Sequence, residues 1–120
     1  MSLAEEAGSR KVVRLPITIA AHSQLMAPAA TGFAEAVDNT PIAAPHMPVI
    51  GNTTAGPMTT PEAIRDELKS QLMGSVRWTE TIQYMVSQGV DTFVEVGPGN
   101  VLLNLVKRID RKSTRLQFEV

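Results

Sequence analysis

The stretch DTFVEVGPGNVLLNLVKRI, residues 91–109, decides the fold class. Its first part, Asp91 to Val96, is rich in β-branched and aromatic side chains and predicts the clearest strand of the chain. Gly97-Pro98-Gly99 predicts a tight turn, and Asn100 opens a helix whose apolar side chains recur at helical spacing. A strand that passes through a tight turn into a helix is typical of α/β folds.

The segments on either side predict further strands and helices in alternation. Strands are expected at residues 11–20, with Pro16 near an edge or a break, at 47–52, and in the alternating tail Leu116, Phe118, Val120. Helices are expected at 4–7 before Gly8 and at 23–37, where Pro28 either starts the helix or kinks it. A third helix is expected after Thr59 or Thr60, with the apolar stripe Ile64, Leu68 and Leu72, and a fourth after Ser75 as far as Gly89. Because strands separated by helices pair in parallel, the expected fold class is α/β with mainly parallel strands.

The bulk composition is that of a soluble globular chain, long enough for one domain. Of its 120 residues 43% are hydrophobic and 19% charged, and the net charge of −1 gives no general attraction to nucleic acid or to an anionic membrane. The sequence has no cysteine, which excludes disulfides and thiolate metal ligands and fits a cytoplasmic protein. Only two histidines occur, so a multi-histidine metal site is not expected.

His22 is the candidate for proton-transfer chemistry. It follows the run 17–21, which is apolar except for Thr18, at the predicted passage from strand to helix. Side chains at such junctions line clefts in α/β proteins, and imidazole moves protons near neutral pH. From the residues alone, a hydrogen-bonded structural histidine is the other interpretation. His46, between Pro45 and Met47, is expected to be a loop histidine.

Three short signatures occur in order along the chain. They are Ala21-His22-Ser23-x-Leu25-Met26, Gln71-Leu72-x-x-x-Val76-Arg77-Trp78 and Glu95-Val96-Gly97-Pro98-Gly99. Together with the elements between them they resemble the C-terminal part of malonyl-CoA:acyl carrier protein transacylases of fatty-acid synthesis, and the related acyltransferase domains of polyketide synthases. The resemblance runs from about Lys11 to Ile109.

The resemblance implies a serine acyltransferase with an α/β-hydrolase-like core and a small ferredoxin-like subdomain. Such an enzyme moves malonyl from coenzyme A, which is a substrate and not a bound cofactor, to a serine and then to the phosphopantetheine thiol of acyl carrier protein. On this match His22 corresponds to the catalytic histidine, and Gln71 to the residue whose main-chain carbonyl orients it. Glu95 is a carboxylate alternative to Gln71, ranked lower because of the match.

The same match divides the chain. Residues 4–18 are expected to end the ferredoxin-like subdomain and residues 19–120 to form the C-terminal part of the acyltransferase core, while residues 1–3 resemble a cloning remnant. A helix as short as 4–7 would not be stable alone, so we expect the natural protein to continue upstream. No Gly-x-Ser-x-Gly elbow occurs in the sequence, and the chain by itself is therefore expected to be inactive.

Some residues leave substrate and partner open. Ala21 stands where malonyl-selective relatives often carry a bulky residue, and Arg77 is expected to serve packing or surface pairing and not to bind the malonyl carboxylate. A basic cluster is a candidate docking patch for acidic carrier protein, or else a set of cations that favour a helix C-terminus: Lys107, Arg108, Arg111, Lys112 and Arg115.

Two further interpretations stand beside these. The Gly97-Pro98-Gly99 turn before a helix is a weak phosphate-cradle pattern, and a tight connection is favoured. A non-catalytic interaction module, binding a carrier protein or a partner subunit, is the alternative class of function. Strand edges and helix faces that should meet an absent half would be exposed, so we also expect copies of the chain to associate.

Overall fold

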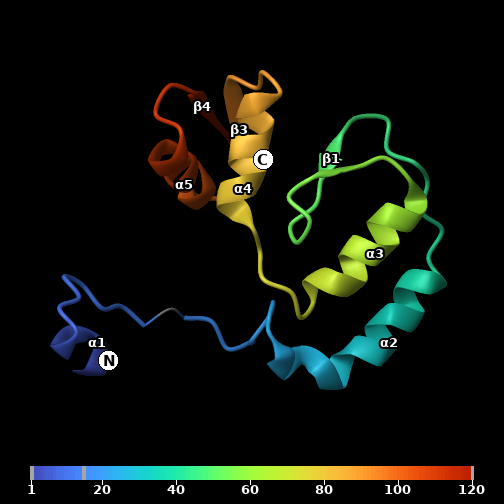
Figure 1. Cartoon of the computed structure of the whole chain (residues 1–120), viewed down its shortest axis with the longest axis horizontal. Helices are drawn as coiled ribbons and strands as arrows, with labels where there is room; N and C mark the ends of the chain where they lie inside the picture. Colours follow the sequence, from blue (N-terminus) through green and yellow to red (C-terminus); the bar gives the residue numbers. More distant parts are fainter. Residues whose placement is uncertain (1, 15, 120) are drawn as a thin grey trace.

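The computed structural model describes residues 2–14 and 16–119 as short helices and two small sheets (Figure 1). The helices are α1 Ser2–Glu6, the 3₁₀ turn η1 Gln24–Met26, α2 Ala27–Asp38, α3 Pro61–Gln71, α4 Trp78–Ser87 and α5 Val101–Ile109. The strands are β1 Val49–Ile50, β2 Pro57–Met58, β3 Thr92–Val96 and β4 Thr114–Phe118. β1 and β2 pair antiparallel, whereas β3 and β4 pair parallel.

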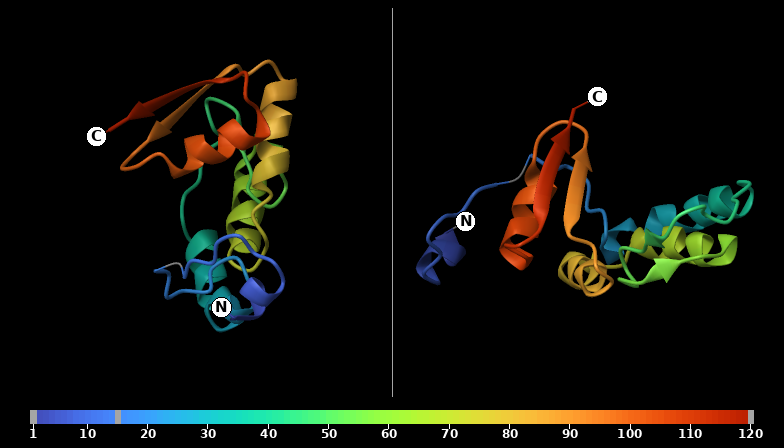
Figure 2. Two further views of the ribbon diagram at one scale, coloured as in Figure 1. Left: turned by 90° about the vertical axis from the view of Figure 1, so that its left-hand side faces the viewer. Right: turned by 90° about the horizontal axis from the view of Figure 1, so that it is seen from above.

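The unit β3–α5–β4 confirms the α/β class. β3 runs parallel to β4, with Thr92 opposite Thr114 and Val96 opposite Phe118, and α5 forms the crossover between them. Gly97 and Gly99 adopt φ values of 128° and 83°, which glycine reaches without steric cost, and so turn the end of β3 sharply into α5. α5 covers one face of the strand pair (Figure 2).

The opposite face of this strand pair is apolar and open. Val94 lies opposite Leu116 and Val96 opposite Phe118, and these four side chains are 51 to 66% exposed. Contiguous apolar surface of this kind marks a contact with other protein. The association of copies of the chain stays a prediction.

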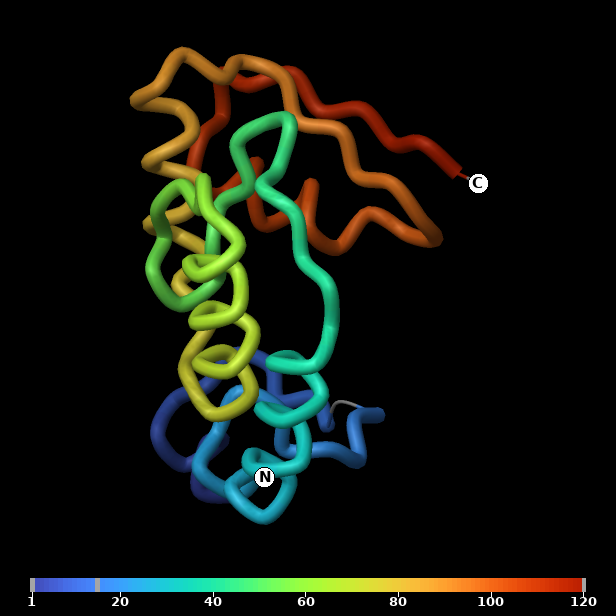
Figure 3. The backbone as a smooth tube through the Cα atoms, turned by 90° about the vertical axis from the view of Figure 1, so that its right-hand side faces the viewer, coloured from blue at the N-terminus to red at the C-terminus, as the bar shows by residue number. Residues whose placement is uncertain are grey.

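The helices α2 and α3 lie side by side, and the hairpin β1–β2 follows α2 along the chain (Figures 1 and 3). Pro28 occupies the first turn of α2, where its missing N–H has no helical partner to lose, so it starts this helix and does not kink it. The Thr60 hydroxyl caps α3 by accepting a hydrogen bond from the Ala63 N–H at 3.1 Å. The structure thus selects one of the two alternatives that the sequence left open at each helix start.

The prediction of a strand at residues 11–20 is wrong for the residues of this range that the structure describes. Residues 11–14 and 16–20 are in no helix or strand, and nearly all of them are exposed. A strand needs a neighbour for its N–H and C=O groups, and no described segment pairs with this one. Leu15, within the predicted strand, lies outside the described residues.

Other boundaries also differ. The strand predicted at 47–52 is reduced to β1, whose Val49 is 40% exposed, and it pairs with β2, which lies between 52 and the next predicted helix, where no strand was expected. The reversal is closed by Gly51 N–H donating to Gly56 O at 2.9 Å, a local turn that the sequence did not predict.

Two further boundaries differ from the prediction. Ser75 does not cap α4, which begins after Arg77. β4 ends at Phe118, and Val120 lies outside the described residues.

The described part of the chain is extended in overall shape. Its radius of gyration is 17.0 Å, against roughly 13.6 Å for a compact chain of 120 residues. The buried apolar residues are Val37, Ala55, Met58, Ile82, Leu103 and Val106. Within residues 2–14 and 16–119, no helix has both the length and the apolar character that crossing a bilayer requires.

Candidate functional site

The backbone of His22 lies two residues before η1 and is hydrogen-bonded to the residue that follows α3. Its φ of 62° lies in the left-handed region, which is uncommon for residues other than glycine and recurs at functional sites. The His22 N–H donates to Leu72 O at 3.0 Å. The next residue, Ser23, caps η1 by accepting a hydrogen bond from the Leu25 N–H. The imidazole is thus presented from a fixed junction.

The side chain of His22 meets the carbonyl of Gln71. The distance from His22 Nδ1 to Gln71 O is 2.6 Å. A carbonyl oxygen only accepts hydrogen bonds, so this contact requires a proton on Nδ1, and in the neutral ring Nε2 then keeps its lone pair. The structure therefore brings together the two residues that the sequence singled out, and it does so through the main chain of Gln71. The imidazole is exposed.

Glu95, the carboxylate alternative to Gln71 as partner of the histidine, has a different role. Its carboxylate oxygens accept hydrogen bonds from the N–H groups of Leu102 and Leu103, at 3.2 and 3.0 Å. These N–H groups belong to the first turn of α5, where a helix has no internal acceptors and favours negative charge. The same bonds occupy the helix N-terminus that a phosphate cradle would use, so the Gly97-Pro98-Gly99 turn serves the connection between strand and helix.

A buried carboxylate on α3, which the sequence reading missed, organises the loop between β1 and β2. Glu67 is only 5% exposed. It accepts hydrogen bonds from the Thr53 N–H at 2.7 Å, the Thr53 hydroxyl at 2.8 Å and the Thr54 hydroxyl at 3.3 Å. Burial by itself raises the pKa of Glu67, but these hydrogen bonds outweigh it, and the pKa lies below the ordinary value of 4.5.

The same loop reaches Gln71 and the segment after α3. Asn52 Nδ2 donates to Gln71 Oε1 at 3.0 Å, while Asn52 O accepts from the Arg77 N–H at 2.7 Å. The Arg77 guanidinium donates to Thr54 O at 3.3 Å and pairs with Glu80 at 3.3 Å. Arg77 therefore makes structural and surface contacts, in agreement with its expected role.

One sequence signal could have identified this network. Glu67 and Gln71 are four residues apart and fall on the same helical stripe as Ile64 and Leu68. Polar side chains on an otherwise apolar stripe require partners, because an unpaired buried polar group is costly. Those partners come from residues 52–54, a loop whose position no local pattern predicts.

The basic cluster near the C-terminus is divided into two places. Lys107, Arg108 and Arg111 are exposed and line, with Asn104, an open concavity of about 510 Å³ along α5. None of the hydrogen bonds or ion pairs found among the described residues engages these three cations. Their charge is available to a partner.

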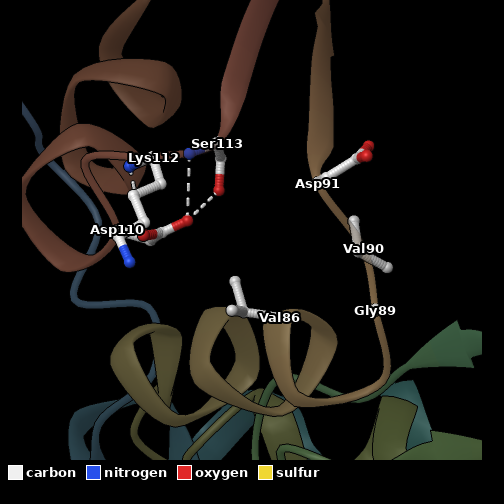
Figure 4. A pocket seen from close by; sticks show the side chains of 7 residues that line it. All are labelled: Val86, Gly89, Val90, Asp91, Asp110, Lys112 and Ser113. Atoms are coloured by element: carbon white, nitrogen blue, oxygen red, sulfur yellow. Dashed lines mark hydrogen bonds between the residues drawn. The ribbon is translucent and has the colours of Figure 1, made fainter.

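Lys112 and Arg115 lie elsewhere. Both lie near a second cavity of about 270 Å³ at the start of β3 and β4; Figure 4 shows Lys112 next to Asp110 on one side of it and Asp91 on the other. Asp110 accepts hydrogen bonds from the Ser113 hydroxyl and from the N–H groups of Lys112 and Ser113, and the hydroxyl, above all, holds the pKa of Asp110 below its ordinary value. The Arg115 guanidinium donates to the carbonyls of Asp110 and Ser113.

No protein-family model matches this chain. It is 40% identical over 110 residues to the malonyl CoA-acyl carrier protein transacylase of Bacillus subtilis, a match that covers 92% of this chain and 35% of that protein. The solved malonyl CoA-acyl carrier protein transacylase of Coxiella burnetii superposes with a TM-score of 0.90 at 38% identity, covering 98% of this chain and 37% of that one.

A further solved structure contains a type II polyketide synthase acyl-carrier protein in complex with its malonyl-transacylase. It superposes with a TM-score of 0.87 at 34% identity, covering 99% of this chain and 38% of that one. The chain spans about a third of the length of the curated relatives that it matches. In sequence and in fold alike, this chain is similar to about one third of a malonyl CoA-acyl carrier protein transacylase.

Proposed function

We propose that this chain is the C-terminal third of an acyltransferase of fatty acid biosynthesis, which moves malonyl from coenzyme A to the phosphopantetheine thiol of acyl carrier protein. The observation that carries the proposal is the 2.6 Å contact between His22 Nδ1 and Gln71 O. It fixes one tautomer of the imidazole and so leaves Nε2 free to act as a base. The similarity to transacylases supports the same chemistry.

In this proposal His22 serves a serine that lies outside the chain. Nε2 takes the proton from the serine hydroxyl, whose oxygen forms a bond to the malonyl carbonyl carbon. The carbon–sulfur bond to coenzyme A then breaks, and the imidazolium returns the proton to the leaving thiolate. The carrier thiol reverses the sequence and restores the serine. Gln71 O stabilises the imidazolium less than a carboxylate would, because it carries no net charge.

The experiment that tests this function compares the full-length natural protein with the 120-residue chain. With isotope-labelled malonyl-CoA and carrier protein bearing its phosphopantetheine, we expect label on the carrier only with the full-length protein. Methylmalonyl-CoA, assayed in parallel, tests whether Ala21 leaves room for a larger acyl group. A full-length protein that transfers neither group would contradict the proposal. A cytoplasmic location also stays a prediction.

The concavity on α5 is the proposed docking surface for acyl carrier protein. Three exposed cations, two on α5 and one just beyond its end, suit an acidic partner, and the relative bound to an acyl-carrier protein supports a partner of this kind. In the full-length protein, reversing two charges with Lys107→Glu and Arg111→Glu is expected to raise the KM for carrier about five- to tenfold at low salt, with a smaller effect at high salt.

Lys112→Glu is the matched control for this charge reversal. Lys112 lies three residues beyond Ile109, the last residue of α5, but it lines the other cavity, next to Asp110 (Figure 4). We expect it to leave the KM for carrier nearly unchanged. If Lys107→Glu/Arg111→Glu also left the KM unchanged at low salt, the docking surface would have to lie elsewhere.

A further inference from the structure

We propose that Asn52 is a positioning residue for His22, acting through Gln71, and that Glu67 fixes the loop that carries Asn52. This inference rests on the proposed function, because it assigns the residues that keep the histidine in its working orientation.

The end of α3 provides the acceptor for the His22 side chain. Gln71 is the last residue of this helix, so its carbonyl has no intrahelical donor and is free to accept from His22. Terminal residues of helices fray, however, because few bonds hold them. The side chain of Gln71 counters this, since its Oε1 accepts from Asn52 Nδ2 at 3.0 Å in a partly buried contact. The amide pair ties the end of α3 to the hairpin loop.

The loop between β1 and β2, which carries Asn52, is itself held in place. Asn52 O is bound by the Arg77 N–H at 2.7 Å, and the adjacent Thr53 N–H is bound by Glu67 at 2.7 Å. The peptide group between Asn52 and Thr53 is thus bound at both its oxygen and its nitrogen, by the main chain of Arg77 and by the side chain of Glu67. Before it, Gly51 lies so close to Glu67 that an added Cβ would be 2.6 Å from Glu67 Oε2. The loop is packed against the carboxylate as well as bonded to it.

The tautomer of the His22 imidazole depends on the position of the end of α3. His22 is bound twice to the end of α3, through its N–H to Leu72 O at 3.0 Å and through Nδ1 to Gln71 O at 2.6 Å. Any loosening of that turn removes the acceptor that selects the Nδ1–H tautomer. A free imidazole places its proton on either nitrogen, so part of the population would carry it on Nε2 and be unable to accept the serine proton. Asn52 therefore affects the chemistry without touching the substrate.

The experiment measures the tautomer of His22 directly in the full-length protein. Two-bond ¹H–¹⁵N correlation spectra are recorded at about pH 8.5, well above the ordinary histidine pKa of about 6.5, and the His22 signals are those that His22→Gln removes. We expect the unmodified protein to show the Nδ1–H form. Asn52→Ala and Gln71→Ala are each expected to shift His22 towards a mixture, because both delete the amide pair while Gln71→Ala keeps the carbonyl.

Transfer kinetics on the same variants give a second readout. Each single variant is expected to lose about three- to tenfold in kcat, the factor set by one hydrogen bond, with the KM for malonyl-CoA nearly unchanged. The double variant should lose no more than either single one, since both remove the same bond. Asn39→Ala is the matched control: it also deletes an asparagine side-chain bond to a helix C-terminal turn, on α2.

The outcomes separate this inference from the proposed function. If His22 keeps the Nδ1–H form and full kcat in both single variants, Asn52 is not a positioning residue, although malonyl transfer stands. If the double variant shows additive losses, the two side chains act independently and the inference is overturned. Loss of activity without any change of tautomer would make the amide pair structural only. If the full-length protein transfers no malonyl, the proposed function fails while the tautomer test still stands.

Discussion

Replacing His22 in the full-length protein is expected to lower kcat for malonyl transfer about 10²- to 10⁴-fold, the contribution of a positioned general base. Asparagine is the better replacement than alanine, because it tolerates the left-handed backbone that His22 adopts, with φ at 62°. His22→Asn therefore removes the imidazole while keeping the junction. The steady-state rate of transfer to carrier protein is the measurement, and circular dichroism confirms the fold.

His46→Ala is the control for this loss. His46 is an exposed histidine of the loop before β1 and is expected to be dispensable. A His22→Asn protein that retained its rate within about tenfold would argue against a base role, and transfer would then need another proton acceptor. Equal losses in the two histidine variants would point to a general effect of the substitutions.

Removal of the Glu67 carboxylate should have the largest effect on stability. Glu67→Ala leaves the part-buried Thr53 N–H without an acceptor, and a hydrogen bond to a charged group contributes about 1.5–3 kcal/mol. We expect the free energy of unfolding of the full-length protein to fall by about 2–4 kcal/mol in urea titrations. Glu62→Ala, at an exposed position of the same helix, should cost less than about 1 kcal/mol.

The pH dependence distinguishes the charge of Glu67 from its shape. The folded state lowers the pKa of Glu67 below 4.5, so the carboxylate stabilises the fold above the unfolded-state pKa, and this stabilisation is lost as the pH falls through the folded-state pKa. Glu67→Gln should thus be less stable than the unmodified protein at pH 7, and the difference should shrink below about pH 4.5. A difference that stayed constant down to acid pH would show that the ionised form contributes nothing.

The sequence predicted the α/β unit well because its signals are local. The strand at Asp91–Val96, the glycine turn and the helix after Asn100 each follow from neighbouring residues, and β3, the turn and α5 lie where expected. The site was predicted in a different way. The contact of His22 with the Gln71 carbonyl followed from the order of family signatures, because no side-chain pattern reveals which main-chain oxygen faces a ring.

The remaining features depend on contacts between distant segments. The hairpin β1–β2 and the loop bound by Glu67 depend on contacts between residues 52–54 and α3, and hydrophobic periodicity does not predict such contacts. The predicted strand at 11–20 failed for the converse reason. Its Val and Ile content suits a strand, but strand formation is decided by a neighbour, and no described segment supplies one.

The contact between His22 and Gln71 also has a consequence for the order of folding. The two residues are 49 positions apart, so their contact closes a long loop, which costs chain entropy and forms late relative to local helices. A newly made chain therefore carries an imidazole free to exchange tautomers until α3 has docked beside it. In the proposed function, the folding of α3 against His22 and the alignment of the base are therefore one event.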